Sequence, residues 1–368
     1  MTLNWKAAQA PYVARPQFLS YGAFEEKRPV LVDCSLGVNP LTDIHPAEIT
    51  PRPTAVYGRY PAGGAHGNAA LAAYITGRWP GVPSEAICFG AGSQGTISSL
   101  SRILGGPSVS VLGFMPQFIP ALLEFATVGA KVTTTPLVAP DFRLDVDALA
   151  AQITNGTTLV YVDNPNNPTG KALPLKDMER LAAACPAKGA LLLVDEAYSD
   201  FVNDAESALN LRAENLICCR SFSKGCGLAG LRTGYIVIND PELRRCYQEL
   251  GLHFSCSVAG ADMAGQLLPD LDLPAMRRRM VALKRRTLDF IAAYPAFRVA
   301  PTHEAVPIFF LQGPQGQDLY NALMEVGIQT EPGFFFGLEG NASVRVRTPS
   351  PQDFDTFCRQ WEKAFGKA

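Results

Sequence analysis

The sequence lacks an excess of charge of either sign, and it lacks long apolar runs. Its 368 residues include 32 Lys and Arg against 34 Asp and Glu, which gives a formal net charge of −2. Nucleic-acid binding normally needs a basic surface, so we expect no nucleic-acid partner. The apolar stretches, such as 190–194, are far shorter than the roughly 20 residues that span a bilayer. We therefore expect no membrane partner either.

Metal-ligand spacings are also missing. The nine cysteines form no CxxC pair, and none of the four histidines stands in an HExxH pattern. These absences argue against a metal centre and favour reduced, buried thiols. The first fifteen residues contain Trp5, Lys6 and Arg15 but no sustained apolar segment, so we expect no export signal and a cytoplasmic location.

Short β-rich segments alternate with helical segments between residues 60 and 260. We expect strands at 86–89, 108–112, 131–135, 158–163, 190–195, 216–220 and 233–238, with helices at 96–104, 116–128, 175–185 and 242–252. This alternation is typical of a mainly parallel sheet with helices on both faces. It predicts a three-layer α/β/α domain with a seven-stranded sheet over residues 46–265.

The pattern changes after residue 266. A long Arg- and Lys-rich helix is expected at 274–294, strands at 306–312 and 343–348, a helix at 316–326, and a last helix from residue 351. We assign residues 1–45 and 266–368 to a second, smaller α+β domain.

A glycine-rich segment, 90–95, follows the expected strand at 86–89 and fits two kinds of phosphate site. Glycines allow close approach to the backbone, and free N–H groups at a helix start suit a phosphate. The segment also fits the GxGxxG dinucleotide pattern, which needs an acid at the end of the next strand. That strand ends Leu112-Gly113-Phe114-Met115 without one. A phosphate cradle is favoured, and a nicotinamide dehydrogenase is the less favoured alternative.

Three further expected strands end in polar residues, at the edge where open α/β sheets bind ligands. The segment NPNNPTG (164–170) follows one strand, Asp195 ends the next, and a third leads to Lys224. A buried carboxylate needs a partner, which could be a protonated ring nitrogen or a structural arginine. Lys224 could be an imine-forming amine or a solvated lysine. Together with the cradle, these groups are what pyridoxal 5′-phosphate needs.

The ordered motifs NPNNPTG, DEAY (195–198) and SFSK (221–224), followed by Arg232, resemble those of the fold-type I pyridoxal-phosphate enzymes, class I/II aminotransferases. The sequence is most similar to the branch that contains histidinol-phosphate aminotransferases and threonine-phosphate decarboxylases. The resemblance extends over nearly the whole chain, from Asn39-Pro40 to Arg345.

The resemblance implies a role for each matching residue. Lys224 would carry the cofactor as a Schiff base and move the substrate proton, Asp195 would pair with the pyridinium nitrogen, and Tyr198 would bind the ring's 3-oxygen. The other cofactor contacts implied are Gly92, Ser93, Gln94, Phe118, Asn167, Ser221, Ser223 and Arg232. Tyr60 would reach the phosphate of a neighbouring subunit, which implies a homodimer with shared active sites.

Substrate residues are implied in the same way. Arg345 would bind the α-carboxylate as a fork, and Asn167 would help to orient it. Gly37 and Asn39, in the segment 35–40, would lie near the substrate. Arg347 shares a strand face with Arg345 and could be a second anion contact or part of a structural ion pair.

Glu331 departs from the family pattern. Members that act on phosphorylated substrates carry an arginine soon after a Gly-Ile pair, whereas Gly327-Ile328 is followed here by Glu331. An acid at this position would repel a phosphate and could attract a cationic side chain, or it could simply be an exposed residue before Pro332.

We therefore expect an aminotransferase that moves the amino group of an α-amino acid to a 2-oxo acid. Two alternatives use the same scaffold. One is a decarboxylase similar to threonine-phosphate decarboxylase. The other is an elimination or cyclisation enzyme that acts on a substituted amino acid, for instance one with a guanidino group.

Overall fold

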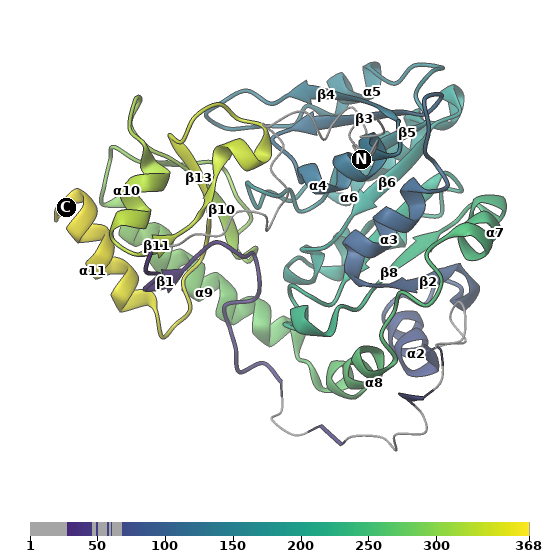
Figure 1. Cartoon of the computed structure of the whole chain (residues 1–368), viewed down its shortest axis with the longest axis horizontal. Coiled ribbons are helices and arrows are strands. Elements are labelled where there is room, and N and C mark those ends of the chain that lie inside the picture. The colour runs from purple at the N-terminus through teal and green to yellow at the C-terminus, as the bar shows by residue number, and fades with distance from the viewer. Residues whose placement is uncertain (1–27, 46–48, 51–56, 59, 61–67, 368) are drawn as a thin grey trace, which may run out of the picture.

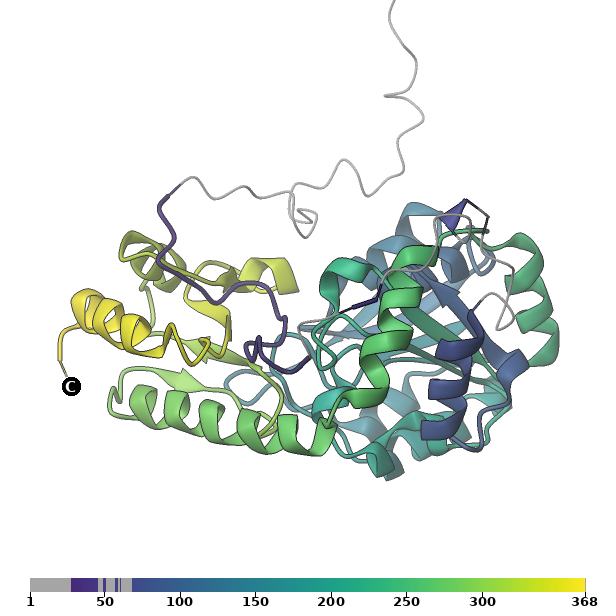
Figure 2. The ribbon, with the colours of Figure 1, turned by 90° about the horizontal axis from the view of Figure 1, so that it is seen from below.

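The computed structural model describes residues 28–45, 49–50, 57–58, 60 and 68–367. These residues form a larger part around a seven-stranded sheet and a smaller part around a four-stranded sheet (Figure 1). The long helix α9 (Leu273–Ala292) extends along the smaller part toward the larger one (Figure 2). None of the helices in the described residues is long and apolar enough to cross a membrane.

The seven-stranded sheet has the strand order β2-β8-β7-β6-β5-β3-β4. Its strands are β2 (Ile87–Gly90), β3 (Ser110–Met115), β4 (Lys131–Pro136), β5 (Leu159–Asp163), β6 (Leu191–Asp195), β7 (Leu216–Ser221) and β8 (Gly234–Ile238). Within this sheet only β8 runs antiparallel to its neighbours. All seven strands expected from the sequence are present, and the mainly parallel sheet is confirmed.

Two helical layers cover this sheet because alternate strand residues face opposite sides. Val160 packs on one side with residues of α2 (Ala69–Arg78), α5 (Val146–Ala151), α6 (Leu175–Ala184) and α8 (Val258–Leu267). Tyr161 packs on the other side with residues of α3 (Gly92–Ser101), α4 (Ile119–Thr127) and α7 (Pro241–Leu250). Every residue of β5 is buried, as expected of a strand covered on both faces.

The smaller part contains an antiparallel sheet with the order β12-β13-β10-β9. Its strands are β9 (Arg298–Val299), β10 (Ile308–Gln312), β12 (Glu331–Pro332) and β13 (Ser343–Arg347), and its helices are α9, α10 (Leu319–Glu325) and α11 (Phe354–Phe365). Strand β1 (Val32–Asp33) pairs in parallel with β11 (Ile328–Gln329). A segment from early in the chain therefore joins elements from its end.

Short 3-10 helices connect these elements. They are η3 (Ser84–Ala86), η4 (Pro186–Lys188), η5 (Ser199–Phe201), η6 (Asp204–Glu206), η7 (Ala208–Asn210), η8 (Ala229–Leu231), η9 (Leu268–Asp270) and η10 (Gly333–Phe336).

Helix α9 makes polar contacts at two points of its length. Near its start, Arg277 donates a hydrogen bond to the carbonyl of Asp200 (2.8 Å) and pairs with Asp204. Farther along, the fully buried Lys284 donates to the carbonyls of His303 (2.8 Å) and Val306 (2.6 Å), just before β10. The helix is thus attached to both parts of the molecule.

The reversed direction of β8 brings additional residues to one edge of the large sheet. Asp163 and Asp195 lie side by side where β5 and β6 end. Because β8 runs the other way, its first residue, Gly234, lies opposite Ser221 of β7 and Gly90 of β2. This edge therefore collects the ends of β2, β5, β6 and β7 together with the start of β8.

Candidate active site

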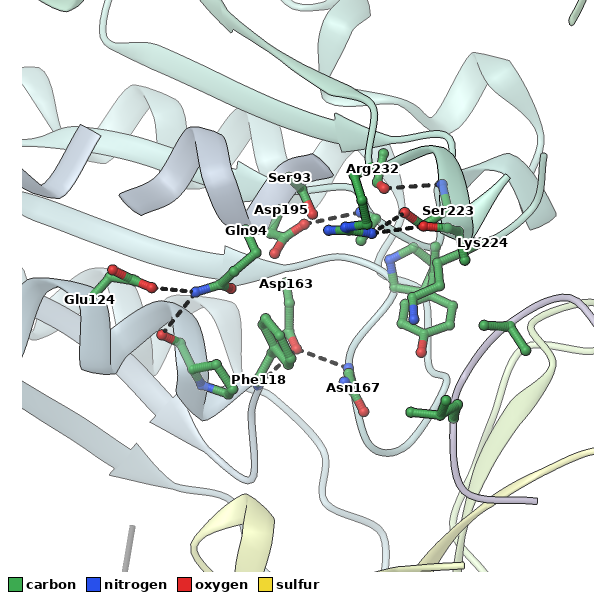
Figure 3. A pocket seen from close by; sticks show the side chains of 18 of the residues that line it. Ser93, Gln94, Phe118, Glu124, Asp163, Asn167, Asp195, Ser223, Lys224 and Arg232 are labelled. Atoms are coloured by element: carbon green, nitrogen blue, oxygen red, sulfur yellow. Dashed lines mark hydrogen bonds between the residues drawn. The ribbon is translucent and has the colours of Figure 1, made fainter. Parts of the chain in front are cut away.

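A cavity of about 790 Å³ opens at this edge of the sheet (Figure 3). Its lining includes ten residues that the sequence singled out as cofactor ligands: Ser93, Gln94, Phe118, Asn167, Asp195, Tyr198, Ser221, Ser223, Lys224 and Arg232. They come from segments far apart in the sequence and meet because their strands end side by side.

One end of the cavity carries a positive charge that no described carboxylate neutralises. The Arg232 guanidinium donates to the carbonyls of Ala229 (3.0 Å) and Ala91 (3.1 Å) and to Ser223 Oγ (3.4 Å). All three acceptors are neutral, and Arg232 forms no ion pair within the described residues. Gly92 begins α3 with a φ of +77°, and a Cβ there would lie 2.8 Å from Arg232 Nη2. Only glycine leaves the guanidinium undisturbed in this position.

Hydroxyl groups surround this charge. Ser93 lies in the first turn of α3, whose free N–H groups carry a partial positive charge. Ser221 Oγ accepts a hydrogen bond from the backbone N–H of Ser223 (3.0 Å), which leaves its own hydroxyl hydrogen available to a ligand. In Figure 3, Ser93, Ser223 and Arg232 lie on the same side of the cavity. This end has the chemistry of a phosphate site.

Asp195 supplies a negative charge in the same cavity. Its carboxylate accepts hydrogen bonds from Tyr161 Oη (3.2 Å) and from the backbone N–H of Ala197 (3.0 Å). Burial raises the pKa of Asp195 to about 6, and these hydrogen bonds oppose the rise. The group is therefore mostly ionised at neutral pH. Within the described residues no arginine or lysine forms an ion pair with it, so a structural arginine is not its partner.

Lys224 is half-buried beside Asp195, and its Nζ lies 5.4 Å from the centre of the Tyr198 ring. Burial, together with the positive charges of Arg345 and Arg232, lowers the pKa of Lys224 to about 7, although Asp195 acts in the opposite direction. Much of this side chain is therefore a neutral amine at neutral pH, the form that acts as a nucleophile or base.

Asp163 joins two segments that line the cavity, and sequence reasoning did not identify it. Its carboxyl accepts hydrogen bonds from the backbone N–H groups of Phe118 (3.1 Å) and Asn167 (2.9 Å) and from Asn166 Nδ2 (3.0 Å). Burial raises the pKa of Asp163, and these hydrogen bonds, all accepted by the carboxylate, oppose the rise. The available signal was an acid at the end of an apolar strand, as at Asp195.

Arg345 reaches the cavity region from the smaller part of the molecule. Its side chain is fully buried; Nη1 donates to Asn167 Oδ1 (3.0 Å) and Nη2 donates to the Ser35 carbonyl. Glu331 lies opposite Arg345 in the β12–β13 pair, with its Oε1 3.8 Å from Arg345 Nη2. The structure thus brings together three of the predicted substrate residues, Arg345, Asn167 and Glu331.

The segment 35–40 packs against the loop that carries Lys224. A Cβ on Gly37 would lie 1.8 Å from Tyr198 Oη, which explains why glycine stands there. Asn39 is buried and donates to the carbonyl of Gly225 (2.9 Å), the residue after Lys224. Both residues therefore fix the packing of the segment 35–40 against residues that line the cavity or follow them.

For three other predicted site residues, the contacts within the described residues do not point to a cofactor or substrate role. Arg347 is buried and donates to the carbonyls of Asp33 and Thr348. Gln94 Nε2 donates to Glu124 Oε1 (2.8 Å), a pair that lies on the side of the cavity away from Lys224 in Figure 3. Tyr60 is 83% exposed and does not line the cavity.

A buried ion network supports the loops of the site, and sequence reasoning missed it as well. Arg220 pairs with Glu196 and with Asp200 (2.8 Å), and Arg78 also pairs with Asp200 (2.8 Å). The ring of Trp79 lies about 5 Å from both guanidinium carbons. Because Glu196 follows Asp195 and Arg220 precedes Ser221, the network fixes the backbone beside two cavity residues.

The donor set fits pyridoxal 5′-phosphate. A cationic, hydroxyl-lined end suits its phosphate, an ionised carboxylate with no arginine or lysine partner among the described residues suits a protonated ring nitrogen, and a neutral lysine amine suits its aldehyde.

Comparison with known families gives the same result for the chain as a whole. Residues 49–360 match the family described as aminotransferase class I and II, and the chain belongs to this family. It is a pyridoxal 5′-phosphate-dependent aminotransferase, with an amino acid and an oxo acid as its substrates. The resemblance inferred from the sequence motifs is confirmed, and the decarboxylase and elimination alternatives are not favoured.

Individual relatives differ in what they are named for. The chain is 31% identical over 302 residues to an aromatic amino acid aminotransferase of Rhodococcus opacus (strain B4), covering 81% of this chain and 80% of the relative. It is 30% identical over 327 residues to histidinol-phosphate aminotransferase 1 of Cupriavidus pinatubonensis, covering 84% and 81%. The α-aminoadipate aminotransferase structure from Thermus thermophilus matches with a TM-score of 0.79 at 21% identity, covering 98% of each chain. This last likeness confirms the predicted fold.

Proposed function

We propose that the cavity binds pyridoxal 5′-phosphate, with Arg232, Ser93, Ser221 and Ser223 at its phosphate, Asp195 at its ring nitrogen, and Lys224 at its aldehyde. The observation that carries this proposal is that Lys224, Asp195 and Arg232 line one cavity, where burial and neighbouring charges lower the pKa of Lys224 to about 7. When bound, the cofactor supplies an electron sink that makes the substrate Cα proton acidic.

The protein's own residues then position the substrate and move one proton. Lys224 Nζ, as a neutral amine with a pKa of about 7, accepts the proton from the substrate Cα. The Arg345 guanidinium binds the substrate α-carboxylate as a fork, with the Asn167 amide beside it. The Tyr198 ring lies beside Lys224 Nζ, with its centre 5.4 Å away. Fixing the substrate in this orientation lowers the entropic part of the barrier.

The test compares Lys224→Ala with Lys176→Ala, since Lys176 is an exposed lysine on α6. Each protein is loaded with the cofactor, an amino acid is added, and oxo acid release is measured together with the near-visible spectrum. We expect Lys176→Ala to behave as wild type and Lys224→Ala to release no oxo acid. Oxo acid release by Lys224→Ala at the wild-type rate would contradict the assignment. Carbon dioxide and an amine in place of the oxo acid would indicate decarboxylation.

We also propose that two copies of the chain form a homodimer with shared active sites. Tyr60 and Phe254 are exposed and lie 5.0 Å apart between ring centres, and Leu250 and Leu252 are exposed beside Phe254 in the sequence. Clustered exposed apolar side chains are typical of protein contacts. Through this surface Tyr60 would serve the site of the other subunit.

Subunit mixing tests the shared site. Tyr60→Ala and Lys224→Ala chains are unfolded and refolded together, and activity is compared with that of each variant alone. If Tyr60 serves the neighbouring subunit, mixed dimers contain one intact site and regain activity. No gain on mixing, with dimers present by sedimentation, would contradict the sharing.

The remaining expectations are kept as proposals. We propose that residues 46–265 form the cofactor domain and that residues 1–45 and 266–368 form the smaller domain; the pairing of β1 with β11 supports this division. Residues 1–27 lie outside the described residues.

We also propose a cytoplasmic location, which the nine free cysteines support.

A further inference from the structure

Glu331 has an incomplete set of partners in a mostly buried position. Its side chain is 12% exposed, and its only ion-pair contact among the described residues is the 3.8 Å approach of Oε1 to Arg345 Nη2. Its carboxylate accepts no hydrogen bond from any residue in the described part of the chain, although its backbone belongs to the β12–β13 pair. A carboxylate removed from water normally accepts several hydrogen bonds, because leaving it without them is costly.

Arg345 does not complete this set. Its Nη1 donates to Asn167 and its Nη2 donates to the Ser35 carbonyl. A separation of 3.8 Å is longer than a charge-assisted hydrogen bond, which is about 2.7–2.9 Å. The nearby acid Asp33 cannot act as a donor, since its own carboxylate accepts from the backbone N–H (2.8 Å) and Oγ (2.6 Å) of Ser35. A ligand bound beside Arg345 can supply the missing donors.

The position of Glu331 beside Arg345 indicates which part of a ligand can supply the hydrogen-bond donors. Glu331 and Arg345 face each other across the β12–β13 pair, and Lys224 is close enough for its charge to act on Glu331. A substrate whose α-carboxylate binds Arg345 therefore lies next to Glu331, within reach of its side chain.

We propose that Glu331 selects α-amino acids whose side chain carries a positive charge, an ammonium or a guanidinium. This inference rests on the proposed function, in which Arg345 binds the α-carboxylate. That carboxylate brings a second negative charge close to Glu331, and a cationic side chain compensates for the repulsion. A carboxylate or phosphate on the side chain adds a third negative charge, so such substrates are disfavoured.

A different interpretation makes Glu331 only a support for Arg345, and the two interpretations predict different kinetics. A support acts on every substrate through the α-carboxylate, so its loss lowers kcat/KM for all amino acids by the same factor. A selecting residue acts through the side chain, so its loss lowers kcat/KM for cationic substrates and spares uncharged ones.

The experiment measures kcat/KM of the cofactor-loaded enzyme for arginine, lysine, phenylalanine, glutamate and histidinol phosphate. We expect wild type to favour arginine or lysine. Glu331→Gln keeps the size of the side chain and removes the charge, and we expect it to lower the best cationic value by about 10- to 100-fold, the range of a hydrogen bond between charged groups. Phenylalanine should change by less than about threefold, and Glu325→Gln, at an exposed glutamate on α10, should match wild type throughout.

A binding measurement provides a readout that does not depend on turnover. 4-Guanidinobutyrate has a carboxylate and a guanidinium but no α-amino group, and glutarate replaces its cation with a second carboxylate. Calorimetric titration of the cofactor-loaded enzyme should show tighter binding of 4-guanidinobutyrate by wild type, and Glu331→Gln should remove that preference.

Two results would overturn the proposal. One is equal or better turnover of phenylalanine or glutamate by wild type than of either cationic amino acid. The other is a uniform loss over all substrates in Glu331→Gln. If no amino acid reacts with wild type at all, the proposed function itself fails, and this inference fails with it.

Discussion

Gly37→Ala is expected to disturb the active site through a single added methyl group. The new Cβ would lie 1.8 Å from Tyr198 Oη, 2.9 Å from Tyr198 Cζ and 3.3 Å from Ile308 Cγ2. Ordinary contacts between such atoms are about 3.5 Å or longer, so the hydroxyl or the segment 35–40 must move by roughly 1.5 Å or more. Tyr198 and Ile308 are buried, which leaves little room for that movement. Overpacking of this kind costs about 1–3 kcal/mol.

The change should appear in stability and in cofactor binding together. Tyr198 packs below Lys224 and follows Asp195 by three residues, so its displacement moves groups that would hold the cofactor. We expect a lower free energy of unfolding in urea and a cofactor affinity reduced by about 5- to 30-fold, the effect of one to two kcal/mol. Cofactor titration followed by near-visible absorbance measures the second quantity.

Two further variants make the test specific. Gly77 lies inside α2, and a Cβ there has no heavy atom within 4 Å; Gly77→Ala should therefore stabilise the protein by about 0.5–1 kcal/mol. Adding Tyr198→Phe to Gly37→Ala removes the hydroxyl and should restore part of the lost stability. If Gly37→Ala unfolds at the wild-type urea concentration and binds the cofactor equally well, the steric explanation is refuted.

Three other predictions concern buried groups. Arg220→Met removes the cation between Glu196 and Asp200 and should lower the free energy of unfolding by about 3–5 kcal/mol, measured in urea; a loss below about 1 kcal/mol would show that the network contributes little. Asp163→Asn replaces an acceptor with an NH₂ group among donors and should cost about 1–3 kcal/mol in the same assay, with weaker cofactor binding. Lys224 loses its proton as pH rises through about 7, so capture of added cofactor by the cofactor-free protein should accelerate over that range and then level off. A rate that falls as pH rises through 7 would contradict this protonation state.

Hydrophobic pattern and motif order predicted much of the fold and many of the residues that line the candidate site. The seven strands were predictable because each buried apolar run is short and lies between turn residues. Asp195 and Lys224 were predictable because each follows such a run. The direction of β8 was not, since a strand buried on both faces has the same composition in either orientation. Yet it is this direction that brings Arg232, just before β8, to the start of α3.

Contacts between side chains that are far apart in the sequence could not be predicted from the sequence. The pairing of Arg220 with Asp200 depends on how β7 and η5 pack, and local periodicity contains no information on that contact. The facing positions of Glu331 and Arg345 depend on the register of β12 against β13. Helix α3 was expected from residue 96 but begins at Gly92, because the glycine-rich segment forms its first turn. Tertiary contacts outweighed the low helix propensity of glycine at that point.

The two anchor points on α9 give that helix the role of a spacer. Arg277 is bonded to Asp200, which is close in sequence to Tyr198, and Lys284 is bonded to the carbonyls that precede β10, the neighbour of Arg345 on β13. The two anchors are seven positions apart, which is almost two helical turns and a rise of about 10 Å, with both side chains on one face. The distance between Asp200 and the carbonyls that precede β10 is therefore fixed by a length of helix, and a one-residue insertion between the anchors would rotate one of them by about 100° away from its partner.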